Sequence, residues 1–399
     1  MEKNNGFKNT KANNSVCTLA KKCGGCQLQN LSYADQLEYK FNQVKRLMGR
    51  FGKVSKVVGM DDPFHYRCKV QAAFGMTRSG KVVSGVYQSS SHRIVCVDDC
   101  MIEDRDADAV IVAVRKLLPS FGIMPYNEDT GKGILRHVLV RKSYSTGELM
   151  VVLVTATPVL PGRNNLVKAL VKRFPKIVTV VQNVNSAATG MVLGERETVL
   201  YGSGRLEDSI CGKRFLISPR SFYQINPAQT EKLYTAAVEL AELTGNETVI
   251  DAYCGTGTIG IVAADRAKQV IGAELNTDAV RDARLNARRN GLDNISFVAA
   301  DAGRFMRELA EEGEKIDLLF TDPPRAGCSR EFLESALVLA PERIVYISCN
   351  PETQARDTAV LVKGGYRVTA IQPFDMFPFT NHIETVACFK RNFDVDMRR

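Results

Sequence analysis

The chain has 399 residues, of which 45% are hydrophobic and 24% charged, a composition that excludes a disordered protein and favours two to three globular domains. No apolar run reaches the length of a membrane helix and the N-terminus lacks the apolar core of a secretory signal, so we expect a cytoplasmic protein that contacts no membrane. Of the net charge of +9, a surplus of eight lies in residues 1–60 (eleven basic, three acidic), which suggests a polyanionic partner, although a solvated basic surface explains it equally well.

Residues 1–60 form the first predicted domain, a basic segment with a cysteine cluster. Cys17, Cys23 and Cys26 lie within ten residues, and Cys100 completes a set of four thiols. Four cysteines hold zinc or an iron–sulfur cluster. The close spacing slightly favours zinc and the single distant fourth cysteine favours iron and sulfur, while thiols without metal are a third interpretation. The other cysteines, apart from Cys349, are assigned to packing: Cys68, Cys96, Cys211, Cys254, Cys328 and Cys388.

A helix follows the cysteines. Ser32 and Asp35 have the spacing of a helix-capping box. Apolar residues then recur at helical spacing, at Leu37, Phe41, Val44, Leu47 and Phe51. The basic residues are predicted on the other faces of the helix, at Lys40, Lys45, Arg46 and Arg50.

Residues 61–220 form a second predicted domain, of the α+β class and rich in strands, which we expect to bind RNA. Predicted strands are 69–74, 81–87, 92–97, 135–141, 149–155 and 177–184. Helices are predicted at 104–118 and 165–173.

Residues 221–399 form the third predicted domain, in which strands and helices alternate. The predicted strands are 248–251, 269–274, 295–299, 316–321, 343–348, 366–371 and 385–389. This order predicts an α/β fold with a mostly parallel seven-stranded sheet, whose ligands bind beyond the carboxyl ends of the strands.

A glycine-rich loop follows the first strand of this domain. It contains G-x-G-x-x-G at Gly255, Gly257 and Gly260, with Glu274 at the end of the next strand, so a dinucleotide-binding oxidoreductase must be considered. Asp251 at the strand end opposes a pyrophosphate and favours a cationic ligand such as S-adenosylmethionine (SAM). Either cofactor has a ribose diol that Glu274 can bind.

The later strand ends also carry polar or reactive groups. Asp301 follows the third strand, Asp322-Pro-Pro-Arg325 the fourth and Ser348-Cys349-Asn350-Pro351 the fifth. Any one of these is explained as well by helix capping or a turn, but together they indicate a functional rim.

Cys349 and Glu384 suggest one particular reaction. Carbon 5 of a pyrimidine is too weak a nucleophile to take a methyl group from a sulfonium unaided, and addition of a thiolate at carbon 6 activates it. A base must later remove the carbon-5 proton. Cys349 lies at a strand end and Glu384 opens the last strand, although burial of the first and solvation of the second are the alternative interpretations.

Taken together, these motifs resemble those of the RNA uracil-5-methyltransferase family, specifically of its iron–sulfur members that methylate 23S ribosomal RNA. The resemblance covers about residues 15–399. It rests on the cysteine set, Ser221-Phe-Tyr-Gln224-Ile-Asn226, Asp251-x2-Cys-Gly-Thr-Gly, Asp322-Pro-Pro-Arg-x-Gly327, Ser348-Cys-Asn-Pro351 and Phe377-Pro-x-Thr-x-His-x-Glu384.

The resemblance implies a Rossmann-like class I SAM-dependent methyltransferase domain and an RNA substrate. By resemblance, Cys349 is the nucleophile and Glu384 the base. Residues implied in SAM binding are Gln224, Tyr253, Thr258, Glu274, Asp301 and Asp322. A [4Fe–4S] cluster on Cys17, Cys23, Cys26 and Cys100 is implied as well, with a structural role, because the transfer requires no electrons.

The chain departs from the family pattern at two places. It has no room before Cys17 for the N-terminal β-barrel of many ribosomal RNA members, and it has Phe379 where relatives often have a polar residue. We expect a monomer. The alternatives are a tRNA uridine-5-methyltransferase, an NAD-dependent oxidoreductase and a non-catalytic, metal-stabilised RNA-binding module.

Overall fold

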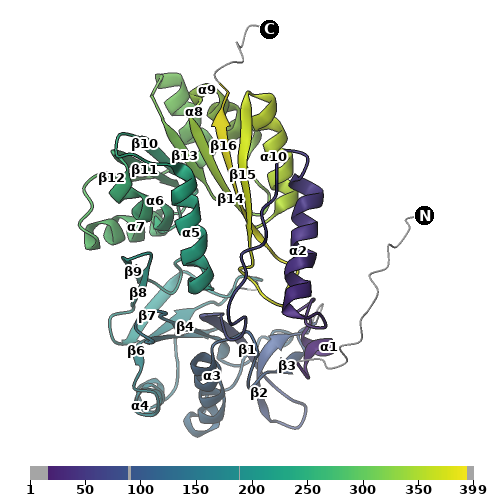
Figure 1. The fold of residues 1–399 in the computed structure, drawn as a ribbon. Helices are drawn as coiled ribbons and strands as arrows, with labels where there is room; N and C mark the ends of the chain where they lie inside the picture. The colour runs from purple at the N-terminus through teal and green to yellow at the C-terminus, as the bar shows by residue number, and fades with distance from the viewer. Residues whose placement is uncertain (1–16, 89–90, 188, 393–399) are drawn as a thin grey trace.

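The structure, a computed structural model, describes residues 17–88, 91–187 and 189–392. The first sixteen residues of the predicted basic segment lie outside this range. Two seven-stranded sheets and a two-stranded ribbon form the framework. Figure 1 shows the central sheet, β1–β7, in the lower lobe and the C-terminal sheet, β10–β16, in the upper lobe.

The central sheet has the strand order β3-β2-β1-β4-β5-β6-β7 and is antiparallel except for the β5–β6 pair. Its strands are β1 (Lys69–Met76), β2 (Val82–Tyr87), β3 (Ile94–Cys96), β4 (Leu135–Lys142), β5 (Leu149–Thr155), β6 (Ile177–Val184) and β7 (Arg196–Tyr201). Its helices are α3 (Arg105–Leu117), a 3₁₀ turn η1 (Leu118–Phe121) and α4 (Arg163–Arg173). The six predicted strands and two predicted helices agree with β1–β6, α3 and α4 to within a few residues, whereas β7 was not predicted.

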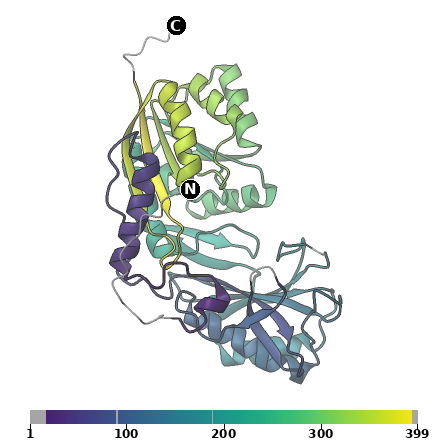
Figure 2. The ribbon, with the colours of Figure 1, turned by 90° about the vertical axis from the view of Figure 1, so that its right-hand side faces the viewer.

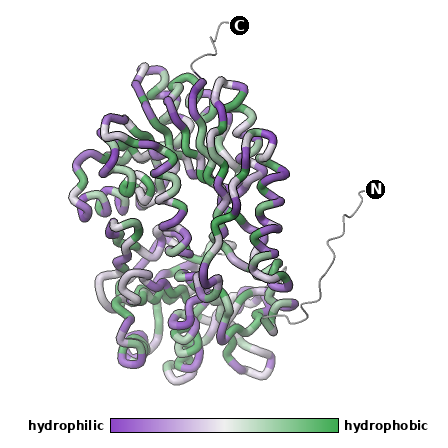
Figure 3. The backbone as a smooth tube through the Cα atoms, viewed as in Figure 1, coloured by the Kyte–Doolittle hydropathy of each residue, from purple (hydrophilic) through white to green (hydrophobic). Residues whose placement is uncertain are grey.

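Every residue of β5 is buried, because both faces of the central sheet are covered. Val151 and Leu153 pack with residues of α3 and α4, while Met150 and Val152 face Leu206 on the other side. Figure 3 shows these strands as hydrophobic segments within the lower lobe. Burial on both faces explains why the strand is a continuous apolar run rather than an alternating one.

A ribbon and a helix connect the two sheets. The ribbon consists of β8 (Leu206–Ile210) and β9 (Lys213–Ile217). The helix α5 (Pro227–Ala241) begins with Pro227 after Asn226, whose side chain accepts the N–H of Gln229. Because proline suits the first turn of a helix and Asn caps it, this boundary follows from local sequence.

The C-terminal sheet has the order β12-β11-β10-β13-β14-β16-β15, with five parallel strands and an antiparallel β15–β16 hairpin at one edge. Its strands are β10 (Thr248–Ala252), β11 (Gln269–Glu274), β12 (Ile295–Ala299), β13 (Leu318–Thr321), β14 (Arg343–Ser348), β15 (Tyr366–Phe374) and β16 (Glu384–Arg391). The remaining helices are α6 (Thr258–Ala263), η2 (Ala264–Arg266), α7 (Thr277–Arg289), α8 (Ala302–Glu312), α9 (Arg330–Leu339) and α10 (Pro351–Lys363). The predicted α/β fold with a mostly parallel sheet is confirmed.

The N-terminal part of the chain packs against this sheet rather than extending from it. After the short α1 (Ala20–Cys23), helix α2 (Tyr33–Met48) runs beside α10 and the β15–β16 hairpin, as Figures 1 and 2 show. The predicted cap is confirmed, since the side chain of Ser32 accepts the N–H of Asp35.

The predicted faces of α2 are wrong in one respect. Its fully buried residues recur every four positions, at Gln36, Lys40, Val44 and Met48. Lys40, expected on another face than the apolar one, is 0% exposed, and its ammonium pairs with the buried carboxylate of Asp375. The sequence pattern counted only apolar residues, so a buried lysine with a distant partner escaped it.

Cys96, assigned to packing, is exposed, and its sulfur accepts a hydrogen bond from Arg115. In the part of the chain that the structure describes, no helix has the length and apolar character that crossing a bilayer requires.

Candidate active site

The glycine-rich loop lies between β10 and α6 at the carboxyl end of the C-terminal sheet. Gly257 has a φ of +79°, and a Cβ there would come within 2.7 Å of the ring of Phe297, so only glycine fits. The N–H of Gly255 donates to the carboxylate of Glu274 at 3.1 Å. Glu274, predicted from spacing, therefore does lie against this loop.

Asp251 has a different position from the one expected. Its side chain lies beneath the loop, fully buried, where it accepts the N–H of Gly260 at 2.8 Å, and its other oxygen has no partner. Burial raises the pKa of Asp251 to about 7. Asp251 therefore holds the start of α6, and the argument that it repels a pyrophosphate directly does not apply.

Four of the other residues implied in SAM binding border the same loop or the strand ends beside it. The ring of Tyr253 packs against that of Phe332, with 5.4 Å between the ring centroids and a tilt of 45°. The backbone of Tyr253 is left-handed, with a φ of 62°. The hydroxyl of Thr258 lies 3.1 Å from that of Tyr234. Asp301 caps α8, and the charge of its carboxylate raises the pKa of Tyr253, after burial as the main cause.

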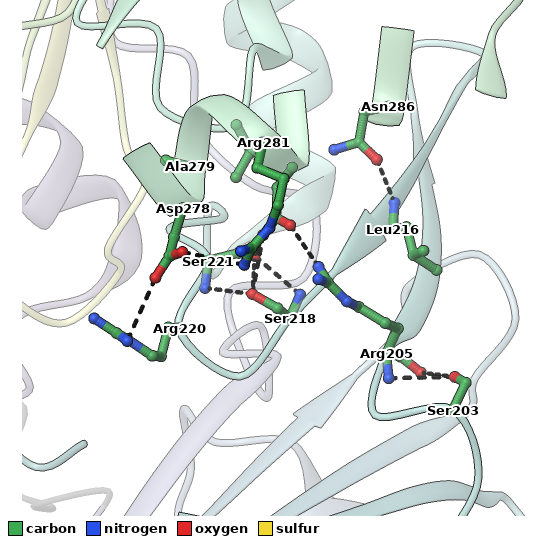
Figure 4. A network of polar contacts seen from close by, with 12 residues as sticks. Ser203, Arg205, Leu216, Ser218, Arg220, Ser221, Asp278, Ala279, Arg281 and Asn286 are labelled. Atoms are coloured by element: carbon green, nitrogen blue, oxygen red, sulfur yellow. Dashed lines mark hydrogen bonds and ion pairs between the residues drawn. The ribbon is translucent and has the colours of Figure 1, made fainter. Parts of the chain in front are cut away.

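Gln224 is carried by the segment between the ribbon and α5. A turn at Ser218–Ser221 begins this segment, and the buried carboxylate of Asp282 accepts both serine hydroxyls, at 3.0 and 2.7 Å. Arg205 pairs with the same carboxylate. Figure 4 shows Arg205, Ser218 and Ser221 converging on α7. The turn thereby ties the Gln224 segment to the C-terminal sheet.

Cys349 and Glu384 lie where two neighbouring strands, β14 and β16, adjoin. The ladder between β14 and β16 ends with Ser348 opposite Thr385. Cys349 follows β14 directly and Glu384 is the first residue of β16, so both residues adjoin the last pair of this ladder. The antiparallel return of β16 beside β14 thus brings together two residues that the sequence separates widely.

The electrostatics agree with this proximity. The pKa of the Cys349 thiol is raised to about 11, first by burial and then by the charges of Glu384 and Asp322. The pKa of Glu384 is raised well above its usual value by burial and by Asp322, and Arg325 opposes both shifts. Burial raises the pKa of Asp322 to about 7. One thiol, two carboxylates and one guanidinium therefore share a single site.

No hydrogen-bond donor reaches the carboxylates of Asp322 and Glu384 within the residues that the structure describes. Both groups are desolvated, Glu384 being only 5% exposed. Buried carboxylates normally have donors, and their absence at a rim is typical of a site that a ligand completes.

Sequence reasoning missed the part played by Arg325. The sequence motif assigns it no role, yet its charge lowers the pKa values of both Cys349 and Glu384. Its place directly after the two prolines that follow Asp322 at a strand end was the available signal.

The four cysteines of the predicted cluster are connected through Cys26. Burial, then the charges of Cys23 and Cys17, raise the pKa of Cys26 to about 11. Cys26 and Cys100 pack against one small apolar cluster, formed by Tyr66, Ile102 and Phe379. Among the described residues, however, no three His, Cys, Asp or Glu side chains are arranged so that they could hold a metal ion.

Comparison with known proteins identifies the family. The sequence profile of tRNA (uracil-5-)-methyltransferases matches residues 207–392. An RNA methyltransferase of Clostridium acetobutylicum, itself uncharacterized, is 43% identical over 94% of this chain and 83% of its own length. A similar protein of Halalkalibacterium halodurans is 46% identical over 93% and 82%.

A solved structure with a similar fold carries more specific information. It is the Pyrococcus abyssi tRNA (uracil-54, C5)-methyltransferase in complex with S-adenosyl-L-homocysteine, with 31% identity, a TM-score of 0.78 and coverage of 92% of this chain and 85% of that one. Sequence and fold agree over both sheets. The chain therefore belongs to the RNA uracil-5-methyltransferase family and is an enzyme that uses SAM to methylate carbon 5 of a uridine in RNA.

Proposed function

We propose that Cys349 is the nucleophile and Glu384 the base of this methyl transfer. The observation that carries the proposal is their proximity: both adjoin the end of the β14–β16 ladder, and the charges of Glu384 and Asp322 act on the Cys349 thiol. A thiol and a carboxylate on neighbouring strands can approach one pyrimidine ring from two directions, which is what addition at carbon 6 and deprotonation at carbon 5 require.

The bonds change in a closed cycle. The Cys349 thiolate forms an Sγ–C6 bond, and the displaced electron pair makes carbon 5 nucleophilic. Carbon 5 bonds to the methyl carbon as the methyl–sulfonium bond breaks. Glu384 then removes the carbon-5 proton, the C5=C6 double bond reforms, and the Sγ–C6 bond breaks to release the thiolate.

The residues around the loop fit SAM. Glu274, Asp301 and Asp322 supply carboxylates, and Asp322 has no donor from the described residues. A cation with a ribose diol satisfies such groups. We propose that Glu274 binds the ribose and that Gln224, Tyr253, Thr258, Asp301 and Asp322 complete the pocket. SAM supplies the methyl group and a positive charge close to these carboxylates.

Two substitutions separate the two roles. Cys349→Ala should abolish turnover and form no covalent RNA–protein complex, since no thiolate remains. Glu384→Gln should form that complex and retain it, because the carbon-5 proton stays in place. Radiolabelled methyl transfer and denaturing gels with bound RNA measure both. Turnover by Cys349→Ala, or a Glu384→Gln variant without the complex, would contradict the assignment.

We further propose that Cys17, Cys23, Cys26 and Cys100 hold a [4Fe–4S] cluster. The support is the proximity of Cys17 and Cys23 to Cys26, and the small apolar cluster against which both Cys26 and Cys100 pack. Iron and acid-labile sulfide should each be present at about four per chain after anaerobic purification, as the cluster formula requires. Stoichiometric zinc, or no metal, would contradict this assignment.

Ribosomal RNA of the large subunit is our proposed substrate, because the bacterial tRNA-specific relatives of the resemblance lack a cysteine cluster. A tRNA substrate is the second candidate, and similarity to the Pyrococcus abyssi enzyme, named for a tRNA position, favours it. Incubation of purified enzyme with unmodified 23S rRNA and with unmodified tRNA, followed by mapping of 5-methyluridine, decides between them. Methylation of tRNA alone would overturn the ribosomal assignment.

A further inference from the structure

The loop Asp375–Ile383 connects β15 to β16 and ends at Glu384. Phe374 pairs with Glu384 in the hairpin, so both ends of this loop adjoin the proposed base. Whatever holds the loop therefore also fixes the direction in which the Glu384 side chain leaves the backbone.

Four consecutive carbonyls of the loop accept hydrogen bonds from distant parts of the chain. The oxygen of Met376 accepts from Asn226 and that of Phe377 from Lys40, both at 3.0 Å. Those of Pro378 and Phe379 accept from the Tyr66 hydroxyl at 3.1 Å and from a backbone N–H at Leu28 at 2.9 Å. Hydrogen bonds to other segments thus hold the backbone of this loop, as hydrogen bonds to a neighbouring strand hold a β-strand.

Most of these partners come from the N-terminal segment. Gln36, one helical turn before Lys40 in α2, accepts the N–H of Phe379 at 2.8 Å. Gln27 accepts the N–H of Asn381 at 3.3 Å. Figure 2 shows α2 lying along the β15–β16 hairpin.

Lys40 is the central member of this set. Its ammonium lies 2.5 Å from Asp375 Oδ1 and 3.0 Å from the carbonyl of Phe377, so it joins two points of the loop. Both partners of the ion pair are 0% exposed. A fully buried ion pair is a weak source of stability, because an apolar pair of similar volume serves as well.

Two features indicate that the geometry of the loop matters beyond stability. Phe379 is buried with a φ of 68°, a strained conformation that persists only where the surroundings impose it and that is common at functional sites. In addition, none of the described residues donates a hydrogen bond to the carboxylate of Glu384. Its orientation therefore depends on its backbone.

We propose that Lys40 is a positioning residue for methyl transfer: by joining Asp375 to Phe377 it fixes the loop that aims Glu384 at carbon 5. The inference rests on the proposed function, since it concerns the step that Glu384 performs. It assigns to the N-terminal helix a direct part in the geometry of the deprotonation step, and Gln36 supports the same loop from the preceding turn.

The test replaces the ion pair by an apolar pair in the double variant Lys40→Met/Asp375→Leu. This change removes the buried charges together, so the protein is expected to fold, which circular dichroism and thermal unfolding check. If Lys40 only stabilises the fold, a double variant as stable as the wild type also turns over at the wild-type rate. If Lys40 positions Glu384, the folded variant still forms the covalent RNA–protein complex at close to the wild-type rate, but releases it about 10- to 100-fold more slowly, as expected for a displacement of the base by about 1 Å.

Two controls make the result unambiguous. Leu361→Ala truncates a buried side chain of α10 away from the rim, and it should lower stability without retaining the complex. Glu384→Gln must retain the complex; if it does not, the proposed function fails. Suppose that Glu384→Gln retains the complex while the folded double variant turns over at the wild-type rate, or forms and releases the complex with rates that are reduced equally. The role of Lys40 is then overturned and that of Glu384 stands.

Discussion

Buried carboxylates occur in both halves of the molecule, and their surroundings differ. In the β8–β9 ribbon beside the central sheet, Asp208 is 1% exposed, and one of its oxygens accepts three hydrogen bonds of 2.9 to 3.0 Å from Ser143 and Ser145. At the rim of the C-terminal sheet, Asp322 and Glu384 accept none from the described residues. The difference distinguishes a carboxylate that stabilises the fold from carboxylates whose hydrogen-bonding capacity is left for a ligand.

The topology of each region explains this difference. The strands of the central sheet are mostly antiparallel and covered on both faces, and the turn that contains Ser143 and Ser145 supplies the donors to Oδ1 of Asp208, although its Oδ2 has no partner in the described part of the chain. The parallel strands of the C-terminal sheet all end at one edge, where helices begin and loops diverge. The surrounding residues remove the carboxylates at that edge from water, but the described residues donate no hydrogen bonds to them. Four substitutions test the contrast.

Replacing a carboxylate of each kind should have opposite effects on turnover and on stability. Glu384→Gln should reduce kcat by about 10²- to 10⁴-fold, the usual contribution of a general base, and leave stability unchanged or higher, because a neutral side chain suits a buried site. Asp208→Ala should leave kcat within about twofold but destabilise the fold by about 1–3 kcal/mol, since it leaves serine donors unpaired. Methyl-transfer kinetics and urea unfolding measure these effects, and a kinetic loss in Asp208→Ala would break the contrast.

The pH dependence of activity tests the rim itself. Cys349 and Glu384 must both lose a proton to act, and both have raised pKa values, that of Cys349 at about 11 in the ligand-free protein. We therefore expect kcat/KM to rise with pH above neutrality. Arg325→Gln removes the charge that lowers both pKa values, so activity at neutral pH should fall several-fold and recover at higher pH. A uniform loss at every pH would instead indicate a role in binding.

The smallest effect concerns the stability contribution of Asp251. Its pKa is about 7 in the folded protein against 3.8 normally, so between about pH 4 and pH 7 the native state holds a proton that the unfolded state has lost. The free energy of unfolding should therefore fall as pH rises through this window. Asp251→Asn, which can still accept the N–H of Gly260, should make that decline shallower. Urea unfolding at pH 5 and pH 7.5 checks this, and an unchanged slope would contradict it.

Much of this protein follows from local sequence. The alternation of strands and helices after residue 226 determined the parallel sheet, because apolar periodicity reports directly which faces are buried. The Ser32 cap, the tight turn at Gly257 and the position of Glu274 beside the loop depend on neighbours in sequence or on the next strand, and the structure has them where the pattern predicts.

Tertiary structure decided the rest. The pairing of β14 with β16 brings Cys349, directly after β14, close to Glu384 at the start of β16. The packing of α2 turns Lys40 inward to meet Asp375, and the burial of Asp251 makes it a support of α6. In each case the partner lies far along the chain, or the outcome depends on how deeply a group is desolvated. Periodicity and motif spacing contain neither kind of information, because the free energy of a buried charge is set by the three-dimensional arrangement of dipoles and charges around it.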